Sequence, residues 1–171
     1  MLGSRYRTNK KFSLENLFSS QFKFASESSL HAIVDACRQM SSNRTGALIV
    51  LARESELIEY IETGEIIDAD VSSELLKNIF FKNAPLHDGA VIIRLNRIKA
   101  ARCILPVSQN LEISPVLGLR HRAAVGITEQ TDAYVIVVSE ETGRISTASN
   151  GKLKEAISPD ELFKILETTG E

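Results

Sequence analysis

Apolar residues follow two different spacings along the chain, and these spacings predict where helices and strands lie. The first is the helical spacing of three and four residues, shared by Leu30, Ile33, Val34, Cys37 and Met40. It predicts a helix that ends near Asn43 and is capped at its start by Ser26 or Ser28. Further helices are predicted at 56–63, at 72–81, within 116–127, and at the C-terminal end, where Ser158 and Pro159 open the last one.

The second pattern is a short continuous apolar run, which is typical of a buried strand. Such runs occur at 45–51, 90–93 and 98–105, and two more strands are predicted at 134–138 and 144–148, joined by the turn 141–143. Because strands and helices are interleaved, the predicted class is α/β, with a mixed central β-sheet covered by helices. We see no repeat and no interior linker, so residues 25–171 are expected to form one domain.

The segment 1–24 has a different character from the rest. Arg5, Arg7, Lys10 and Lys11 precede the first acidic residue, Glu15, and apolar residues follow closely. One interpretation is a basic tail and an amphipathic helix that packs on the domain. The other is a juxtamembrane linker that follows a membrane anchor missing from this chain. No apolar run in the sequence approaches the ~18 residues that span a bilayer.

Composition narrows the possible partners. The 171 residues are 43% hydrophobic and carry a formal net charge of -2, so the chain has no general attraction to nucleic acid. An anionic substrate would therefore need a local basic cluster. Cys37 and Cys103 match no metal-binding spacing, and we interpret them as reduced thiols of a cytoplasmic protein.

Three segments depart from the core-building pattern. The first is Leu86-His87-Asp88-Gly89-Ala90, where a carboxylate and a flexible glycine precede an apolar strand. This arrangement suits a binding site, because glycine lets a ligand approach the backbone. A simple Asp-Gly turn that enters a strand is the alternative.

The second segment is basic. Arg120, His121 and Arg122 stand among Gly, Leu, Ala and Val residues. Arginine forks match phosphate oxygens, and unpaired arginines in apolar surroundings are costly, so the triplet indicates an anion site. A solvated basic face is the alternative.

The third segment is Ser139-Glu140-Glu141, which follows a predicted strand and is interpreted either as part of a site or as a polar hairpin turn. No Gly-rich loop ending in Lys-Ser or Lys-Thr and no dinucleotide fingerprint is present. A nucleotide would have to be held in another way.

Taken in order, these segments resemble the signature of the diadenylate cyclases. Asp88-Gly89-Ala90 followed by Arg120-His121-Arg122 is similar to the paired motif of that family, and the likeness extends roughly from Leu30 to Gly151. The membrane-anchored class, in which three transmembrane helices precede the catalytic domain, is the most similar. The resemblance implies an enzyme that joins two ATP molecules into cyclic di-AMP, works as a homodimer, and sits at the membrane facing the cytoplasm in its full-length form.

The resemblance also implies roles for individual residues. Asp88 lies near the ribose and metal and helps to activate the 3′-hydroxyl, with Gly89 and Ala90 beside it. His121 binds the divalent metal or the phosphates, while Arg120 and Arg122 serve phosphate binding and subunit organisation. Ser139 and Glu140 contact the triphosphate and metal, and the Leu105 backbone reads the adenine edge. Asp88, His121 and Glu140 are thus the expected ligands of Mg²⁺ or Mn²⁺.

The sequence departs from the family pattern at two substrate-contacting positions. Leu119 stands where the family usually has a Thr whose hydroxyl faces the phosphates, and Ile104 stands where an aromatic often stacks on adenine. One hydrogen bond to a charged group is worth ~1.5–3 kcal/mol, so Leu119 is expected to weaken ATP binding unless backbone N–H groups compensate.

Two other functions remain open on the sequence. A catalytically inactive nucleotide-binding domain of the same fold is the main alternative. The second is an HD-type phosphohydrolase with His87 and Asp88 as its metal dyad, although such enzymes need further ligands on a helical scaffold.

Overall fold

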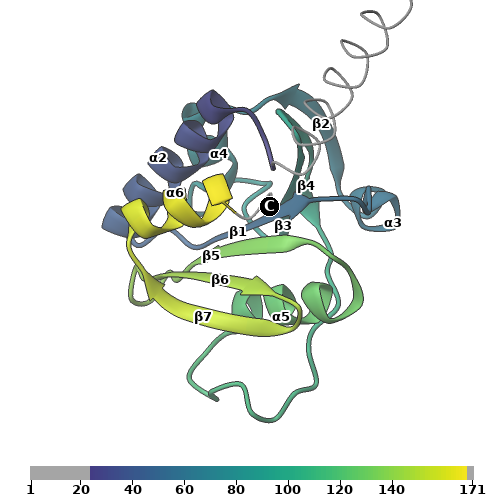
Figure 1. The fold of residues 1–171 in the computed structure, drawn as a ribbon, viewed down its shortest axis with the longest axis vertical. Helices are drawn as coiled ribbons and strands as arrows, with labels where there is room; N and C mark the ends of the chain where they lie inside the picture. The colour runs from purple at the N-terminus through teal and green to yellow at the C-terminus, as the bar shows by residue number, and fades with distance from the viewer. Residues whose placement is uncertain (1–23, 169–171) are drawn as a thin grey trace, which may run out of the picture.

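The computed structural model describes residues 24–168 of the chain, and its centre is one sheet. The strands are β1 (Ala47–Ala52), β2 (Glu65–Asp70), β3 (Ala90–Arg94), β4 (Arg97–Cys103), β5 (Tyr134–Val138), β6 (Ile145–Ser149) and β7 (Lys152–Ile157). They form a 7-stranded sheet in the order β2-β4-β3-β1-β5-β6-β7 (Figure 1). β1 and β3 run parallel, and the other neighbours run antiparallel, so the sheet is mixed as predicted.

Helices cover both faces of this sheet. They are α2 (Glu27–Asn43), α3 (Ile58–Ile61), α4 (Ser73–Phe80), α5 (Leu119–Gln130) and α6 (Pro159–Thr168). α2, α4 and α6 gather on one face, whereas α5 lies on the other (Figure 1). The α/β class expected from the interleaved pattern is confirmed.

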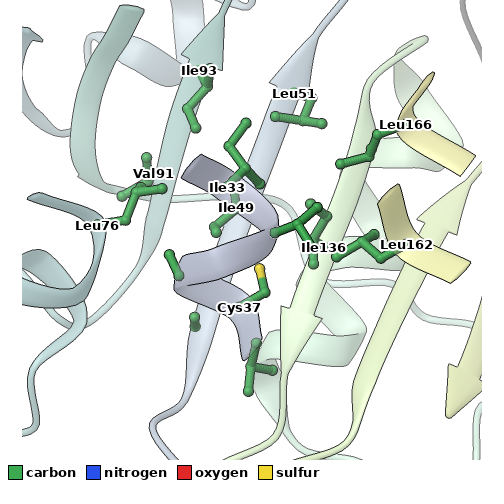
Figure 2. Close-up of a cluster of buried hydrophobic side chains, with 14 of the residues drawn as sticks. Ile33, Cys37, Ile49, Leu51, Leu76, Val91, Ile93, Ile136, Leu162 and Leu166 are labelled. Carbon is green, nitrogen blue, oxygen red and sulfur yellow. The ribbon is translucent and has the colours of Figure 1, made fainter. Parts of the chain in front are cut away.

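Side-chain alternation along β1 explains why the central strands are apolar throughout. Ile49 and Leu51 belong to the cluster under α2, whereas Leu48 and Val50 belong to the cluster under α5. Figure 2 shows Ile33 and Cys37 of α2 packed over the first of these two surfaces, with α6 alongside. A strand buried on both faces reads as one apolar run, which is why this strand was predictable.

The predicted ends of α2 agree with the structure, whereas those of α3 and α5 differ. Ser26 is the N-cap of α2, and its hydroxyl accepts a hydrogen bond from the Ser29 N–H. α3 is shorter than the predicted 56–63, and α5 begins at Leu119, because the backbone of Gly118 is still extended.

β2 and β7 were not predicted. Both are outer strands, paired on one side only, and most of their side chains are exposed or half-buried. Backbone hydrogen bonds to β4 and β6 hold them in the sheet, so they need no apolar run.

The basic linker and the juxtamembrane segment predicted within 1–24 lie outside the described residues, except for Phe24. That residue is buried and its ring packs on Tyr134, so the packed domain includes it. No helix in the described part of the chain is long and apolar enough to cross a membrane.

Candidate active site

A cavity of about 750 Å³ lies on the α5 face of the sheet, where β1 begins and β5 ends. Its walls come from the turn before β3, the end of β4, the first turn of α5 and the loop after β5. The long loop between β4 and α5, at the bottom of Figure 1, contributes apolar side chains. This volume is in the ~300–1,000 Å³ range of small-molecule sites.

The turn before β3 places Asp88 at the cavity. Gly89 has φ +94, and a Cβ there would lie 2.8 Å from the Cys103 carbonyl oxygen, so only glycine fits between the turn and the end of β4. The Asp88 carboxylate is 81% exposed and available to a ligand. The turn therefore places an exposed carboxylate at the cavity, close to the end of β4.

His87 presents a second polar atom next to this carboxylate. Its Nδ1 lies 2.7 Å from the Ala84 carbonyl oxygen, an acceptor, so Nδ1 carries the proton. In the neutral imidazole Nε2 is then an acceptor, and it faces Asp88 Oδ1 at 3.3 Å. Two acceptors this close can bind a cation between them.

The first turn of α5 forms the cationic wall. Gly118 caps the helix without a side chain, which leaves the first N–H groups of α5 without a capping acceptor. These N–H groups and the helix dipole favour an anion at this end. Leu119, Arg120 and His121 of this turn all line the cavity.

Arg120 is mostly buried and weakly tethered. Its Nη1 lies 3.6 Å from Glu140 Oε1, and its Nε is buried without a hydrogen-bond partner. Buried polar groups normally have partners, so a guanidinium left this way is a candidate for binding a ligand.

His121 is almost fully buried, and burial lowers its pKa below the usual 6.5. The charge of Glu155 opposes this shift, Arg120 adds to it, and Glu141 opposes it again. The imidazole is therefore neutral near neutral pH, the form that can accept a hydrogen bond or bind a metal.

The loop after β5 supplies a hydroxyl and carboxylates. The Ser139 hydroxyl oxygen accepts hydrogen bonds from the N–H groups of Glu141 and Thr142, each at 3.2 Å. A hydroxyl has two acceptor positions and one donor, so the hydrogen of Ser139 remains available to a ligand oxygen. The side chain of Glu140 is 58% exposed beside Arg120.

Part of the cavity lining is apolar. Ile104, Val107, Val116 and Leu119 are exposed large side chains that line the cavity, and Leu105 is a buried lining residue. The Ile104 N–H donates to the Thr63 hydroxyl, whereas the Leu105 backbone makes no hydrogen bond within the described residues. An aromatic ring with polar edges would find both surface and partners here.

The cavity offers few metal ligands in one place. Among residues 24–168, no group of three or more His, Cys, Asp and Glu side chains is arranged to hold a metal ion. Asp88, His121 and Glu140 line the same cavity without forming a closed ligand cage. The carboxylates of Asp88 and Glu140 fit Mg²⁺ or Mn²⁺ when substrate phosphates complete the coordination.

The structure brings most of the predicted site residues together. Those that line the cavity are Asp88, Gly89, Leu105, Leu119, Arg120, His121, Ser139 and Glu140. Ala90 and Arg122 are not among the lining residues. Ala90 is buried in β3, and the carbonyl of Arg122 accepts the Ser108 N–H, which ties α5 to the loop after β4.

Sequence reasoning did not assign roles to Glu141, Arg144 and Glu155, which also line the cavity. Glu155 was hidden because its strand, β7, was not predicted, and the positive φ of Ala156 interrupts the alternation that would mark a strand. The HD-type alternative finds no support here, because His87 and Asp88 lie in a turn before a strand and no third ligand joins them in the described residues.

Comparisons with known proteins agree with one another. Residues 34–153 match the family described as DisA bacterial checkpoint controller nucleotide-binding, the DAC family. Cyclic di-AMP synthase CdaA of Bacillus subtilis is 50% identical over 143 residues, which are 84% of this chain and 52% of that protein. A diadenylate cyclase of Listeria monocytogenes is 50% identical over 80% of this chain and 50% of its own length.

Solved structures give the same answer. DacA from Staphylococcus aureus, in a double mutant form, superposes with a TM-score of 0.82 at 46% identity, covering 84% of this chain and 96% of that chain. A hypothetical membrane spanning protein from Bacillus cereus superposes with a TM-score of 0.73 at 45% identity, covering 77% and 64%. The chain spans about half the length of the curated relatives it matches. The ordered motifs, the mixed sheet and these matches together place the chain in the DAC family, the family of the diadenylate cyclases.

Proposed function

We propose that this chain is the catalytic domain of a diadenylate cyclase, which condenses two ATP molecules into cyclic di-AMP and two pyrophosphates. The observation that carries the proposal is the mixed lining of one cavity. Its apolar side chains suit adenine, and the first turn of α5 with Arg120 suits a triphosphate, while Asp88 lines the same cavity.

ATP would be held without any Gly-rich loop. The free N–H groups at the start of α5, the Arg120 guanidinium and the Ser139 hydroxyl are donors for phosphate oxygens. The unpaired backbone of Leu105 offers a donor and an acceptor to the adenine edge. Leu119 lacks a hydroxyl, so the backbone N–H groups of its turn carry more of the phosphate contact.

The reaction needs positioning and charge neutralisation more than covalent catalysis. The 3′-oxygen of one ATP attacks the α-phosphorus of the other, the bond to pyrophosphate breaks, and the same exchange closes the ring. Asp88 is the group placed to accept the 3′-hydroxyl proton, directly or through water. Arg120 balances the charge that develops on the phosphate oxygens.

A divalent cation fits this site when it binds together with ATP. Asp88, His121 and Glu140 are the residues that would hold Mg²⁺ or Mn²⁺, with His87 next to Asp88. The cation would neutralise phosphate charge and polarise the phosphoryl group. Because the protein provides few ligands in one place, metal binding should be much tighter with ATP than without it.

The proposal extends to assembly and location. One cavity holds one ATP, so two domains must meet for cyclisation, and the full-length protein is proposed to work as a homodimer held at the membrane and facing the cytoplasm. Support for the location comes from the resemblance to the anchored class and from the relative described as membrane spanning. Nucleic acid is not an expected partner.

Incubation with ATP and Mn²⁺ or Mg²⁺, followed by chromatography and mass spectrometry, tests the function. Cyclic di-AMP and pyrophosphate are expected in a 1:2 ratio, by the balance of the reaction. A domain that binds ATP and its metal but releases no product would instead be the inactive nucleotide-binding domain considered as the alternative. Replacing ATP with GTP tests whether the Leu105 backbone and the apolar lining recognise adenine.

A further inference from the structure

Gly46 lies directly before β1, against the guanidinium of Arg120. A Cβ built on Gly46 would lie 2.6 Å from Nη1, 2.7 Å from Cζ and 3.1 Å from Nη2 of Arg120. Three atoms of one planar group at such short distances mean that the guanidinium rests on the bare glycine backbone. Any residue other than glycine would place a Cβ in the space that the guanidinium occupies.

Backbone conformation does not explain this glycine. The glycines with positive φ in the described part of the chain are Gly89, Gly143 and Gly151, and Gly46 is not one of them. An alanine could therefore adopt the same backbone, and the three atoms nearest to its Cβ would all belong to the flexible end of the Arg120 side chain. The need for glycine at residue 46 comes from Arg120.

Arg120 has little else to fix its direction. Its charged partner in the described residues is Glu140, at 3.6 Å, and its Nε has no hydrogen-bond partner. The pairing of Ala47 with Val138 brings the start of β1 beside the loop that carries Glu140. Gly46 and Glu140 thus flank the guanidinium at the edge of the cavity.

We infer that Gly46 is a positioning residue. Because it has no side chain, the Arg120 guanidinium can occupy the position from which it binds the phosphates of the nucleotide. The inference rests on the proposed function for the identity of the ligand. It predicts that residue 46 acts on nucleotide binding through Arg120 and through nothing else.

A double-mutant cycle tests this directly. The affinity for a non-hydrolysable ATP analogue with Mn²⁺ is measured by calorimetry for the wild type, Gly46→Ala, Arg120→Ala and the double variant. Gly46→Ala should weaken binding by about 10-fold or more, the size expected when a charged hydrogen bond is lost. In the Arg120→Ala background, Gly46→Ala should change nothing, because coupled residues are not additive.

Adenosine separates this role from a general structural one. It carries no phosphate, so its affinity should be the same for the wild type and Gly46→Ala, and the thermal midpoint should stay unchanged. An analogue affinity equal to wild type in Gly46→Ala would overturn the inference. Equal losses with and without Arg120 would overturn it too.

The test also gives a result if the proposed function is wrong or if a variant does not fold. If the wild type binds the analogue but makes no cyclic di-AMP, the proposed function fails while the binding cycle still reports on Gly46. If the wild type binds no nucleotide, a crystal structure of Gly46→Ala decides: a displaced guanidinium supports the inference and an unmoved one overturns it. Should Gly46→Ala fail to fold, recovery in the double variant supports it and failure there overturns it.

Discussion

At the scale of single residues, Asp88 carries most of the proposed chemistry. It is an exposed carboxylate at the cavity, with His87 as its neighbour. The glycine that follows it is required by its positive φ and by the close contact with the end of β4. If Asp88 served only to form the turn before β3, its negative charge would not be required. Charge and shape can therefore be separated by substitution.

Asp88→Asn should keep the fold and abolish cyclisation, because the amide retains the shape but cannot accept a proton or hold a cation in the same way. We expect the rate to fall by ~10²-fold or more, the contribution typical of a general base. Initial rates of cyclic di-AMP formation measure it. Asp160→Asn is the matched control. Asp160 lies on α6, is 91% exposed and pairs with Arg38 of α2, so this variant should have wild-type activity. A well-folded Asp88→Asn enzyme with normal rates would remove Asp88 from the mechanism.

Leu119 offers a test in the opposite direction. It is 74% exposed at the cavity and occupies the first position of α5, where a hydroxyl could reach a phosphate. Leu119→Thr should raise kcat/KM by about 10-fold if that hydrogen bond is missing in this chain. Leu119→Val, which has the shape of Thr without its hydroxyl, is the control. No gain in Leu119→Thr over Leu119→Val would mean that the helix N–H groups already compensate.

The two cysteines give a prediction about reactivity and pH. Burial raises the pKa of Cys37 to about 12 and that of Cys103 to about 11, so neither thiol should react quickly with a disulfide reagent in the native protein at about pH 8. Both should react at once in denaturant. Because the folded pKa values exceed the unfolded value of 9.0, folding stability is fully present below about pH 9 and should decline as the pH rises towards the folded values. Denaturant unfolding across this range measures the decline, and fast labelling of the native protein would contradict the assigned burial.

At the scale of elements, the start of α5 matters more than the basic character of the triplet. Arg120 and His121 face the cavity, whereas Arg122 does not line it and its carbonyl anchors the loop after β4. A helix places consecutive residues about 100° apart, so Arg122 lies about 200° around the helix from Arg120 and is turned away from the cavity that Arg120 lines. The triplet therefore combines binding with the placement of a neighbouring loop.

Replacing Arg120, His121 and Arg122 together with Ala should abolish cyclisation and weaken binding of an ATP analogue by more than ~10²-fold, since the charged contact of Arg120 and the imidazole of His121 are lost at once. Calorimetric titration measures the affinity. Arg38→Ala removes a basic residue from an exposed pair and is the control, with little change expected. Affinity undiminished by the triple substitution would establish the alternative of a solvated basic face.

At the scale of the whole molecule, the proposed product sets the requirement for symmetry. Cyclic di-AMP contains two identical 3′–5′ linkages, so each ATP acts once as nucleophile and once as electrophile. Two identical cavities facing each other across a two-fold axis meet this need, with the same patch used on both domains. That patch should surround Asp88 and the first turn of α5, which are polar and charged, so the dimer should be weak.

Specific activity should therefore rise with enzyme concentration over the range in which domains associate, and it should be higher when domains are held together at a membrane. Initial rates at saturating ATP, measured beside sedimentation at the same concentrations, provide the comparison. A tagged domain tethered to vesicles serves as the high-density arm. Constant specific activity down to concentrations with only monomer would contradict the face-to-face arrangement.

The sequence by itself determined the parts of this protein that depend on local patterns. β1 is apolar throughout because it is buried on both faces, and α2 shows its buried stripe and its serine cap, so both could be predicted. Motif order identified the family and most of the residues at the site. These features are readable because the chemistry of neighbouring residues in the chain causes them.

Tertiary structure alone decided the rest. β2 and β7 exist because their backbones pair with β4 and β6, and such pairing leaves little mark on side-chain pattern. Glu155 reaches the cavity from one of these strands, and Gly46 meets Arg120 from a segment far away in sequence. Contacts between distant segments depend on strand order and register, and no local spacing encodes which glycine will face which arginine.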